Sequence, residues 1–537
     1  MTGSRQARPA PGGRPTSWGR SPSGAQSAAG RIAVGLAELP ESTDVLVIGL
    51  GITGAGVALD AATRGLDVVA VDAEDIAFGT SRWSSKLVHG GLRYLAKGQL
   101  DVAHESAVER GILMQITAPH LVHALPMLMP LTPAIGRGQA ALARSGIRAG
   151  DLLRLAARTH RETLPRPRRI GITETMTLAP VVRREGLRGA ILSWDGQLED
   201  DVRLVLAVAR TAAAHGARVH TRVKVSDALG DSAVLTDART GESRTIRART
   251  VINATGVWAG HLVPEIRLRP SRGTHIVLRK ETLPGVRCAV MAPVPGASNR
   301  FVFALPQPDQ TFYVGLTDEE VDGEIPDVPE APEEDIDFLL EVINSVLQRD
   351  VRREDVVGAF AGLRPLLDTG TTTADISRKH AVLVSSSGVV TVVGGKLTTY
   401  RQMAQDAVDQ AVETARLQAG PCVTRSLPLL GAAPRHLLAG LRSSERLVRR
   451  FGTEAPDVLA DAVAVTGLSE DELLAPIAPG LHATLAELVF GITHEGATTV
   501  EDLLDRRTRI GLVPADRELA RPAAERALEL VGARQAP

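Results

Sequence analysis

The chain has 537 residues, and its composition is 44% hydrophobic and 23% charged, with a formal net charge of −1. The length exceeds what one compact core accommodates and predicts roughly three to four domain-sized units. This balance excludes a disordered or strongly polyionic chain, and no bulk attraction to nucleic acid is expected. Cys288 and Cys422 form no CxxC pair, so the sequence predicts neither a disulfide framework nor a metal site and suits a reducing cytoplasmic environment.

Residues 1–40 contain little except Arg, Pro, Gly, Ser and Ala, with a single Trp18. Such a composition cannot bury enough apolar surface to offset the entropy of ordering, so we expect a disordered N-terminal tail without a targeting role. The most apolar long run, Leu121–Ile135, carries His123 and several prolines and is shorter than the roughly twenty residues that a spanning helix needs. No transmembrane helix is predicted.

The first candidate for a folded element is the short apolar run Asp44–Ile48, which is typical of a buried parallel strand. The glycine-rich turn 49–56 follows at once, and a helical pattern then extends to about Arg64. Strand, glycine turn and helix in this order form the phosphate-binding start of a dinucleotide-binding domain, because the helix N-terminus attracts phosphates.

Each glycine of this turn has its own expected role. Gly49 permits the tight turn, Gly51 lets the backbone approach a pyrophosphate, and Gly54 lets the helix pack closely on the strand. A second strand, Val68–Val71, ends at Asp72, whose carboxylate can accept hydrogen bonds from the adenosine ribose hydroxyls. A glycine turn that serves packing alone is the alternative, and the downstream acid argues against it.

Two later strand-to-glycine junctions, Val251–Gly256 and Val389–Lys396, bear on the choice between NAD and FAD. Neither is followed by a ribose-binding acid of its own, so they look like further walls around one long cofactor, which favours FAD. The second leads into residues 397–404, a predicted helix whose positive end would face the flavin pyrimidine and stabilise the reduced ring. Ordinary strand-to-helix turns are the alternative for each junction taken singly.

The stretch Thr80–Leu95 reads TSRWSSKLVHGGLRYL, and with it the chain resembles the FAD-dependent, quinone-linked glycerol-3-phosphate dehydrogenase family. The resemblance extends in collinear order over residues 40–530. Its further motifs are Asp200–Asp201 before Arg203–Leu204, NATGVW at 253–258, GTHIVL at 273–278, GLRPL at 362–366, GGKLTTYR at 394–401 and the late stretch 501–509. Two departures, Leu316 where the family often has threonine and Asp72 where it usually has glutamate, concern fine positioning.

The resemblance implies an α/β fold. A Rossmann-like FAD-binding domain would be interleaved with an antiparallel-sheet substrate domain, as in D-amino-acid oxidase, within residues 41–420. Residues 421–537 would form a C-terminal all-α domain, where Leu437–Leu447 and Leu481–Val489 show apolar residues at helical spacing. We expect this domain to serve stability or partner contact only. His494–Glu495 there lacks a second histidine four residues away, so metal binding is not expected.

The resemblance also implies which residues contact FAD. The motif 80–95 would pass from the flavin pyrophosphate to the isoalloxazine and then to the substrate. The predicted cofactor set combines the glycine turn, the ribose acid, this motif and the later junctions: Gly49, Gly51, Ile52, Thr53, Gly54, Asp72, Thr80, Ser84, Ser85, Lys86, His89, Gly91, Leu92, Val225, Ala254, Thr255, Gly256, Gly395, Lys396, Leu397 and Thr398.

A small phosphorylated polyol needs fixed cations for its phosphate and a group that accepts the hydroxyl proton as hydride leaves. Arg93, Arg364, Arg378 and Lys396 are the predicted cations, and the resemblance adds Tyr94 to the substrate pocket. Arginine forks match phosphate oxygens bidentately, and a neighbouring glycine leaves room for a long side chain to reach inward. A solvated or structural ion pair is the alternative for any one of these arginines.

For the catalytic base, the sequence favours His275, because a neutral imidazole near pH 7 can take the C2 hydroxyl proton while hydride moves from C2 to flavin N5. Arg364 would stabilise the developing oxyanion. His89 is the competing base, although its place before Gly90–Gly91 suits a residue packed close to the flavin ring. A hydrogen-bonded structural histidine is the alternative for either.

The stretch Arg144–Arg169 contains eight arginines against Asp151 and Glu162, and it encloses Leu152, Leu153 and Leu155. Such a segment can lie on an anionic bilayer with arginines at the headgroups and leucines below, and a solvated helix and loop is the alternative. The family resemblance favours the membrane, because its members are peripheral dehydrogenases that pass electrons to respiratory quinone. We therefore expect a cytoplasmic protein on the inner face of the cell membrane.

Three functions are compared. The leading one is oxidation of sn-glycerol 3-phosphate to dihydroxyacetone phosphate, with menaquinone or ubiquinone as acceptor, by a chain that also forms a homodimer. The second is a glycerol-3-phosphate oxidase using O2, or another FAD-dependent amine or amino-acid oxidase of the same superfamily. The third is a non-catalytic flavin-binding module. The predicted cations disfavour an amine substrate, which would call for carboxylates or an aromatic cage, and no long insertion of the kind that marks oxygen-using members is seen.

Overall fold

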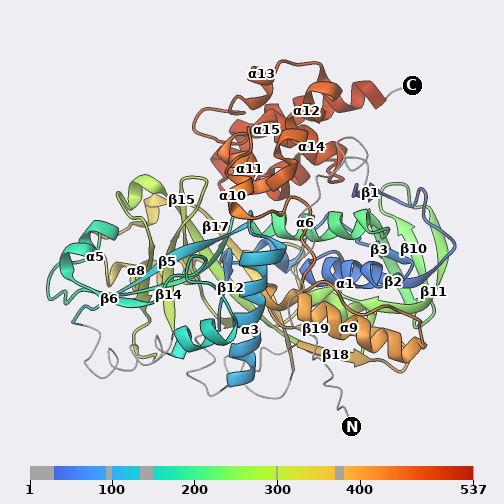
Figure 1. Ribbon diagram of the computed structural model, residues 1–537, viewed down its shortest axis with the longest axis horizontal. Coiled ribbons are helices and arrows are strands. Elements are labelled where there is room, and N and C mark those ends of the chain that lie inside the picture. Colours follow the sequence, from blue (N-terminus) through green and yellow to red (C-terminus); the bar gives the residue numbers. More distant parts are fainter. Residues whose placement is uncertain (1–29, 92–98, 134–148, 298–299, 369–379, 536–537) are drawn as a thin grey trace, which may run out of the picture.

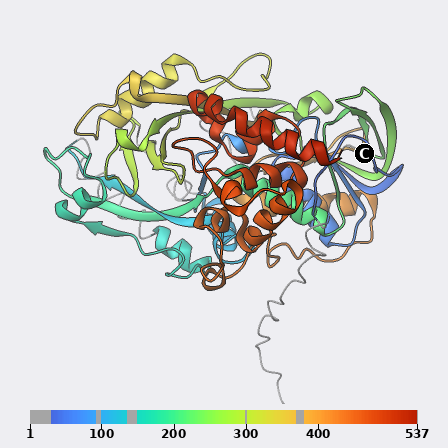
Figure 2. The same ribbon diagram turned by 90° about the horizontal axis from the view of Figure 1, so that it is seen from above.

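The structure of the protein, a computed structural model, describes residues 30–91, 99–133, 149–297, 300–368 and 380–535. Two sheets with their flanking helices lie at opposite ends of the molecule (Figure 1). The C-terminal helices, coloured orange to red, sit across the region between the two sheets, as the view from above shows (Figure 2). In the described chain, no helix is long and apolar enough to cross a membrane.

The first sheet contains the predicted dinucleotide-binding strand. Its strands run in the order β1 (Ala33–Val34), β8 (Arg218–Thr221), β3 (Val68–Val71), β2 (Ser42–Ile48), β11 (Ser243–Asn253), β10 (Ser232–Asp237) and β9 (Val223–Leu229), with β19 (Val390–Gly394) beside β11 and β18 (His380–Val384) beside β19. The strands from β1 to β11 and β19 pair in parallel. The apolar run at 44–48 therefore forms the buried parallel strand that its composition predicts.

Helices cover one face of this sheet. Helix α1 (Ile52–Thr63) lies between α6 (Asp201–Ala214) and α9 (Tyr400–Ala415). Side chains alternate across β2: Val45 and Val47 join the core under these helices, whereas Leu46 and Ile48 join the core of the opposite face. Both faces are thus buried, which is why the strand reads as a continuous apolar run.

The second sheet runs in the order β16 (Glu319–Glu320), β12 (Leu268–Arg279), β15 (Thr311–Gly315), β14 (Phe301–Pro306), β13 (Ala289–Pro293), β5 (Val122–Pro130), β7 (Ala190–Leu198) and β4 (Leu87–Val88), with β17 (Val356–Leu367) beside β12 and β6 (Arg168–Ile170) beside β7. Neighbouring strands are antiparallel except β13 and β5. Helix α8 (Glu333–Asn344) buries Ile336 and Leu339 against Ile276 and Val314 of the sheet.

The chain passes back and forth between the two sheets. Strands of the first sheet come from residues 33–71, 218–253 and 380–394, and strands of the second come from the intervening stretches 87–198 and 268–367. Helix α3 (Leu100–Ile112), which contacts residues 397–399, and the short helices α5 (Ile172–Leu178) and α7 (Ala259–Leu262) complete this part. The interleaved α/β architecture is therefore confirmed.

The N-terminal prediction was wrong for residues 30–40. Strand β1 pairs with β8, and Ile32, Leu36 and Leu39 are buried. The backbone N–H of Ile32 also donates to the carbonyl of His494 at 3.1 Å, which links this stretch to the C-terminal domain. A few well-spaced apolar residues suffice to add an edge strand, and averaging the composition over forty residues conceals them.

Residues after 421 form the C-terminal helical domain. Its helices are α10 (Arg435–Leu438), α11 (Glu445–Phe451), α12 (Ala455–Thr466), α13 (Glu470–Leu474), α14 (Leu485–Thr493) and α15 (Pro514–Gln535). The spacing of apolar residues in Leu437–Leu447 does not mark one helix, because Ser444 caps α11 with a hydroxyl that accepts from the N–H of Leu447 and so starts a new helix. Phe451, Leu488 and Phe490 lie in the buried core of the domain.

Charged side chains are buried where this domain meets the first sheet. Asp75, in the loop after β3, accepts from Arg506 Nε at 2.5 Å and from Arg507 Nη1 and Nη2 at 2.6 and 2.8 Å. Arg203 of α6 pairs with Glu495, and Arg450 pairs with Asp200, the residue that caps α6. Because a buried charge without its partner is costly, these pairs fix the domain in one position on the sheet.

Candidate active site

The glycine turn has the geometry that a pyrophosphate requires. Gly49 has φ of 99°, and a Cβ on Gly54 would lie 1.8 Å from the Gly49 carbonyl oxygen, so both positions need glycine. At Gly51, in contrast, an added Cβ would meet only Ser81 Oγ, at 3.1 Å. The N-terminus of α1, which bears the predicted residues Ile52 and Thr53, faces Ser81, whose Oγ accepts from the Ile52 N–H at 2.9 Å, and such a helix start favours a phosphate.

Asp72 lies directly beside this turn, at the end of β3. Its Oδ2 accepts from the N–H of Leu50 at 2.6 Å, and its Oδ1 accepts from the N–H of Glu74 at 2.9 Å. Burial raises the pKa of this carboxyl to about 6, against the effect of the two backbone donors. Each oxygen keeps a further lone pair, so the ionised carboxylate can also accept from ribose hydroxyls.

We expect Asp72→Asn to weaken FAD binding about tenfold or more, because a charge-assisted hydrogen bond contributes ~1.5–3 kcal/mol and the amide NH2 cannot accept from a ribose hydroxyl. The dissociation constant of FAD, measured by titrating apoprotein and following flavin fluorescence, gives the effect. Asp44→Asn, at the opposite end of β2, is the matched control and should leave it unchanged. An unaltered constant in Asp72→Asn would remove the ribose role.

The other predicted cofactor residues surround the same end of the first sheet. Ala254 follows β11 and packs against Gly49, and Gly256 has φ of 63° with no atom within 4 Å of an added Cβ. Val225 lies on β9, whose first residue Val223 donates its N–H to the Asp72 carbonyl at 2.8 Å. The two later junctions contribute the rest of the set. Thr255 follows β11, and between β19 and α9 lie Gly395, Lys396, Leu397 and Thr398.

The loop Thr80–Lys86 connects this end of the sheet to the second sheet. Thr80 Oγ1 donates to the Leu363 carbonyl of β17 at 2.6 Å. The side chains of Ser84 and Lys86 both donate to Asp201 Oδ2, at 2.8 and 2.7 Å. These two side chains are therefore bound to a buried carboxylate, and any contact of either residue with FAD is left to the backbone.

Ser85 points the other way and meets the predicted base. Its Oγ lies 2.8 Å from His275 Nε2. The imidazole of His275 stacks on Phe360 with ring centroids 4.8 Å apart, and a Cβ on Gly315 would lie 2.2 Å from its Cδ2, so the ring is held on both sides. His275 Nδ1 is buried and has no hydrogen-bond partner within the described residues, which leaves this nitrogen for a ligand.

Burial, with the nearby charges of Lys86 and Arg364, lowers the pKa of His275 to about 3. The imidazole is therefore neutral near pH 7. A neutral ring can accept a proton or a hydrogen bond from a hydroxyl.

Arg364 lies on β17 opposite Ser271 of β12. Its Nη1 donates to Ser271 Oγ at 3.0 Å and to Asp318 Oδ1 at 3.1 Å, and its Nη2 donates to the Thr317 carbonyl at 3.3 Å. A Cβ on Gly273 would lie 2.3 Å from Nη2, so the glycine of the GTHIVL motif makes room for the guanidinium. Lys396, after β19, donates from Nζ to Ser106 Oγ of α3 at 2.7 Å.

His89, the competing base, forms a pair that the sequence did not indicate. Its Nδ1 lies 3.0 Å from Asp195 Oδ2, and Arg110 Nη1 donates to Asp195 Oδ1 at 2.7 Å. Although burial raises it, the charge of Arg110 and the contact with His89 hold the pKa of Asp195 below its usual range. Asp195 thus orients an imidazole that is still 46% exposed. Gly91, two residues on, has φ of 81°.

Leu92, Arg93, Tyr94 and Arg378 lie outside the described residues, and their predicted roles stay predictions. Asp195, Ser106 and Phe360 were missed, because nothing in their local sequence distinguishes them. The Asp200–Asp201 pair, in contrast, was visible as a motif, and the structure shows that Asp201 anchors the loop 80–86.

Comparisons with known proteins agree with this geometry. A family model described as FAD dependent oxidoreductase matches residues 44–401, so the fold and site define an FAD-dependent oxidoreductase. A second model, the C-terminal domain of alpha-glycerophosphate oxidase, matches residues 422–535. The chain is 55% identical over 483 residues to glycerol-3-phosphate dehydrogenase 1 of Mycobacterium tuberculosis, covering 88% of this chain and 92% of that one. It belongs to the glycerol-3-phosphate dehydrogenase family.

More distant relatives extend the match. The chain is 35% identical over 534 residues to the mitochondrial glycerol-3-phosphate dehydrogenase SDP6 of Arabidopsis thaliana, covering 91% of this chain and 81% of that one. The solved structure of glycerol-3-phosphate dehydrogenase from Bacillus halodurans, complexed with FAD, has a TM-score of 0.68 and 28% identity and covers 91% of this chain and 95% of that chain. The predicted family, fold class and FAD cofactor are thus confirmed.

Proposed function

We propose that this protein oxidises sn-glycerol 3-phosphate to dihydroxyacetone phosphate and passes the electrons to a respiratory quinone. The proposal rests mainly on one observation. The neutral imidazole of His275 lies beside Ser85 of the loop 80–86, and Arg364 is a cation near the same imidazole. The names of the relatives support the substrate. When bound, FAD supplies the acceptor for the hydride of C2, at N5 of its ring.

The protein's own residues bind the substrate and move its proton. Arg364 and Lys396, with Arg93 and Arg378, hold the phosphate and stabilise the oxyanion at C2. His275 Nδ1, the buried nitrogen that is left for a ligand, accepts the C2 hydroxyl proton when Nε2 donates to Ser85. The glycine turn and Asp72 hold the other end of the cofactor.

The reaction is tested with the purified yellow protein in the absence of oxygen. Addition of sn-glycerol 3-phosphate should bleach the flavin absorbance within seconds, whereas glycerol, which lacks the phosphate, should not. A protein that stays yellow with both compounds contradicts the substrate. The reduced protein is then mixed with a soluble quinone analogue or with oxygen. Faster reoxidation by the quinone supports the dehydrogenase, and faster reoxidation by oxygen identifies an oxidase instead.

Because a respiratory quinone is dissolved in the membrane, we propose that the protein binds the inner, cytoplasmic face of the membrane through the stretch 149–169. Residues 149–156 are helical, and they expose Leu152 and Leu155 by 66% and 49%. Arg158 and Arg161 beside them are exposed. Arg154 was wrongly expected to face the headgroups: it is buried, and it donates to Asp151 and to the Thr159 carbonyl. Arg144 and Arg148 lie outside the described residues.

The double variant Leu152→Ser/Leu155→Ser should bind anionic lipid vesicles about tenfold or more weakly, since burying each leucine stabilises binding by ~1.5 kcal/mol or more. Flotation with vesicles at low and high salt measures the bound fraction. Leu229→Ser, an equally exposed leucine on β9, is the matched control. Equal binding of both variants would place the membrane contact elsewhere.

A further inference from the structure

One segment of the C-terminal domain contacts the active-site loop 80–86. Residues 502–513 form a helical turn, Asp502–Arg507, and a second short turn, Ile510–Leu512, before α15 begins. Arg509 lies between the two turns and is 5% exposed. Its φ of 67° is in the left-handed region that non-glycine residues rarely adopt, at a cost of about 1 kcal/mol or more. Such a conformation persists only where the surrounding contacts impose it.

The guanidinium of Arg509 joins the flavin-binding loop. Its Nη2 donates to the Arg82 carbonyl at 2.5 Å, and its Nη1 donates to the Asp505 carbonyl at 3.0 Å. The group also lies 5.4 Å from the ring centroid of Trp83. A residue of the C-terminal domain therefore fixes the backbone of the loop one turn before Ser85.

The same carbonyl is shared with the residues that flank Ser85. The Arg82 carbonyl also accepts from Lys86 Nζ at 3.1 Å, and Lys86 in turn pairs with Asp201. Asp201 Oδ1 lies 3.9 Å from Arg509 Nε. Arg509, Lys86 and Asp201 thus hold the loop 82–86 in place. Ser85 lies between Arg82 and Lys86, the two residues that these contacts fix.

The other member of the Ser85–His275 pair is also supported by this segment. Leu512 and Val513 pack in one cluster with Val277, Tyr313 and Phe360, and Phe360 is the ring on which His275 stacks. A Cβ on Gly358 would lie 2.1 Å from the Leu512 carbonyl oxygen, so the strand and this segment are in direct contact. The C-terminal domain therefore contacts residues that hold Ser85 and residues that hold His275.

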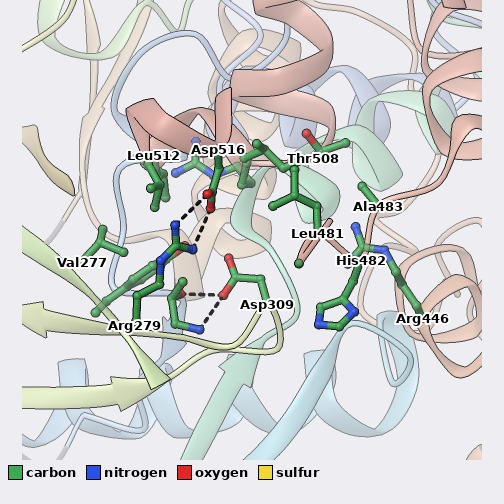
Figure 3. A pocket seen from close by; sticks show the side chains of 16 residues that line it. Val277, Arg279, Asp309, Arg446, Leu481, His482, Ala483, Thr508, Leu512 and Asp516 are labelled. Atoms are coloured by element: carbon green, nitrogen blue, oxygen red, sulfur yellow. Dashed lines mark hydrogen bonds and ion pairs between the residues drawn. The ribbon is translucent and has the colours of Figure 1, made fainter. Parts of the chain in front are cut away.

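A small cavity of about 40 Å³ lies where the C-terminal domain meets the second sheet (Figure 3). Arg279 of β12 donates from both Nη atoms to Asp516 at 2.6 and 2.8 Å across it, and Leu481 and Leu512 line it from the domain side. The domain is thus attached to the second sheet as well as to the first, and Arg509 lies where the two attachments meet.

Attachment alone does not require Arg509. The ion pairs of Asp75 with Arg506 and Arg507, of Arg203 with Glu495 and of Arg279 with Asp516 already link the domain to both sheets. Arg509 differs from these arginines because both of its hydrogen bonds go to backbone carbonyls rather than to a carboxylate, and one of these carbonyls belongs to the loop that bears Ser85.

We propose that Arg509 is a positioning residue of the active site, through which the C-terminal domain holds the loop 80–86 so that Ser85 meets His275. The inference rests on the proposed function insofar as glycerol 3-phosphate oxidation is one of its readouts. The domain then has a role in catalysis that goes beyond stability or partner contact.

The test compares Arg509→Met and Arg509→Lys with the control Arg521→Met, which removes an arginine that pairs with Glu518 inside α15. We expect amide hydrogen exchange in the peptide 80–91 of Arg509→Met to be about tenfold faster, equivalent to ~1.4 kcal/mol of lost protection. The kcat per bound flavin should fall by about the same factor, with KM changed less than about twofold. Lysine, which can still donate one hydrogen bond, should restore most of both.

A residue with a structural role only would lower the thermal midpoint and the yield while leaving exchange in 80–91 and kcat per flavin as in the wild type, and that result overturns the proposal. If Arg509→Met does not fold, the same measurements are made on Arg509→Gln, which lacks the charge, and a folded Arg509→Gln protein that matches the wild type in loop exchange and kcat overturns it too. Should the wild type fail to oxidise glycerol 3-phosphate, the exchange measurement still decides the role of Arg509, so the two failures are distinct.

Discussion

Arg364→Met is expected to reduce kcat/KM for sn-glycerol 3-phosphate by about a thousandfold, equivalent to ~4 kcal/mol of transition-state stabilisation. The guanidinium is partly buried, at 21% exposed, and its fork lies on β17 close to His275. Charge-assisted hydrogen bonds to phosphate or to an oxyanion are strong in such a site, and methionine retains only the apolar stem of the side chain. The rate of flavin reduction in anaerobic stopped-flow experiments, as a function of substrate concentration, measures this loss.

Two further variants show whether the guanidinium itself is responsible. Arg364→Lys keeps the charge but not the fork, and it should recover only part of the rate. Arg269→Met removes a neighbouring arginine of the same sheet, which pairs with Glu320, and should have nearly wild-type kinetics. Comparable rates in Arg364→Met and Arg269→Met would show that the phosphate is bound elsewhere.

His275→Gln should lower the rate constant of flavin reduction about a hundredfold to a thousandfold, because glutamine can fill part of the space but cannot take up a proton. Since the flavin-binding residues are untouched, the absorption spectrum and the affinity for FAD should stay as they are. His89→Gln, whose imidazole Asp195 orients, is the comparison that separates the two candidate bases. A larger loss in His89→Gln than in His275→Gln would transfer the base to His89.

The pH dependence gives a second criterion for the same choice. A base works when it is deprotonated, and burial with the charges of Lys86 and Arg364 lowers the pKa of His275 to about 3. If His275 is the base, it is in the active form throughout the neutral range, and its protonation reduces the rate only as the pH falls toward 3. A rate that already falls with pH near neutrality would contradict the assignment.

Much of the cofactor half of the site could be predicted, because its physics is local. Gly49, Gly51 and Gly54 lie in one short stretch of strand, turn and helix, and Asp72 ends the next strand; Gly49 and Gly54 need glycine for a backbone reason. The motifs at 80–95 and 394–401 extended this to the interleaved architecture through family resemblance. The motifs that contain His275 and Arg364 were also found in this way.

The partners of these residues could not be predicted, because they come from distant parts of the chain. Ser85 and His275 are 190 positions apart, and Arg509 is 427 positions from the carbonyl that it contacts. The direction of the Lys86 side chain depends on Asp201, which comes 115 positions later. No periodicity links such positions, and for the same reason the composition of residues 1–40 did not reveal that β1 pairs with β8.

The order of strands in the first sheet constrains how the protein can fold during synthesis. Strand β2 can pair early with β3, but its other neighbour, β11, leaves the ribosome only after β4, β5, β6 and β7 of the second sheet, and the adjoining β19 leaves it only after all the strands of that sheet. Parallel pairing across such long intervening segments is slow, and until it occurs the apolar edge of β2, and then that of β11, stays exposed to other chains. A nascent chain of this enzyme therefore has to be protected from aggregation until residues near 394 have emerged, and a truncated chain ending before β19 could not complete the sheet that binds FAD.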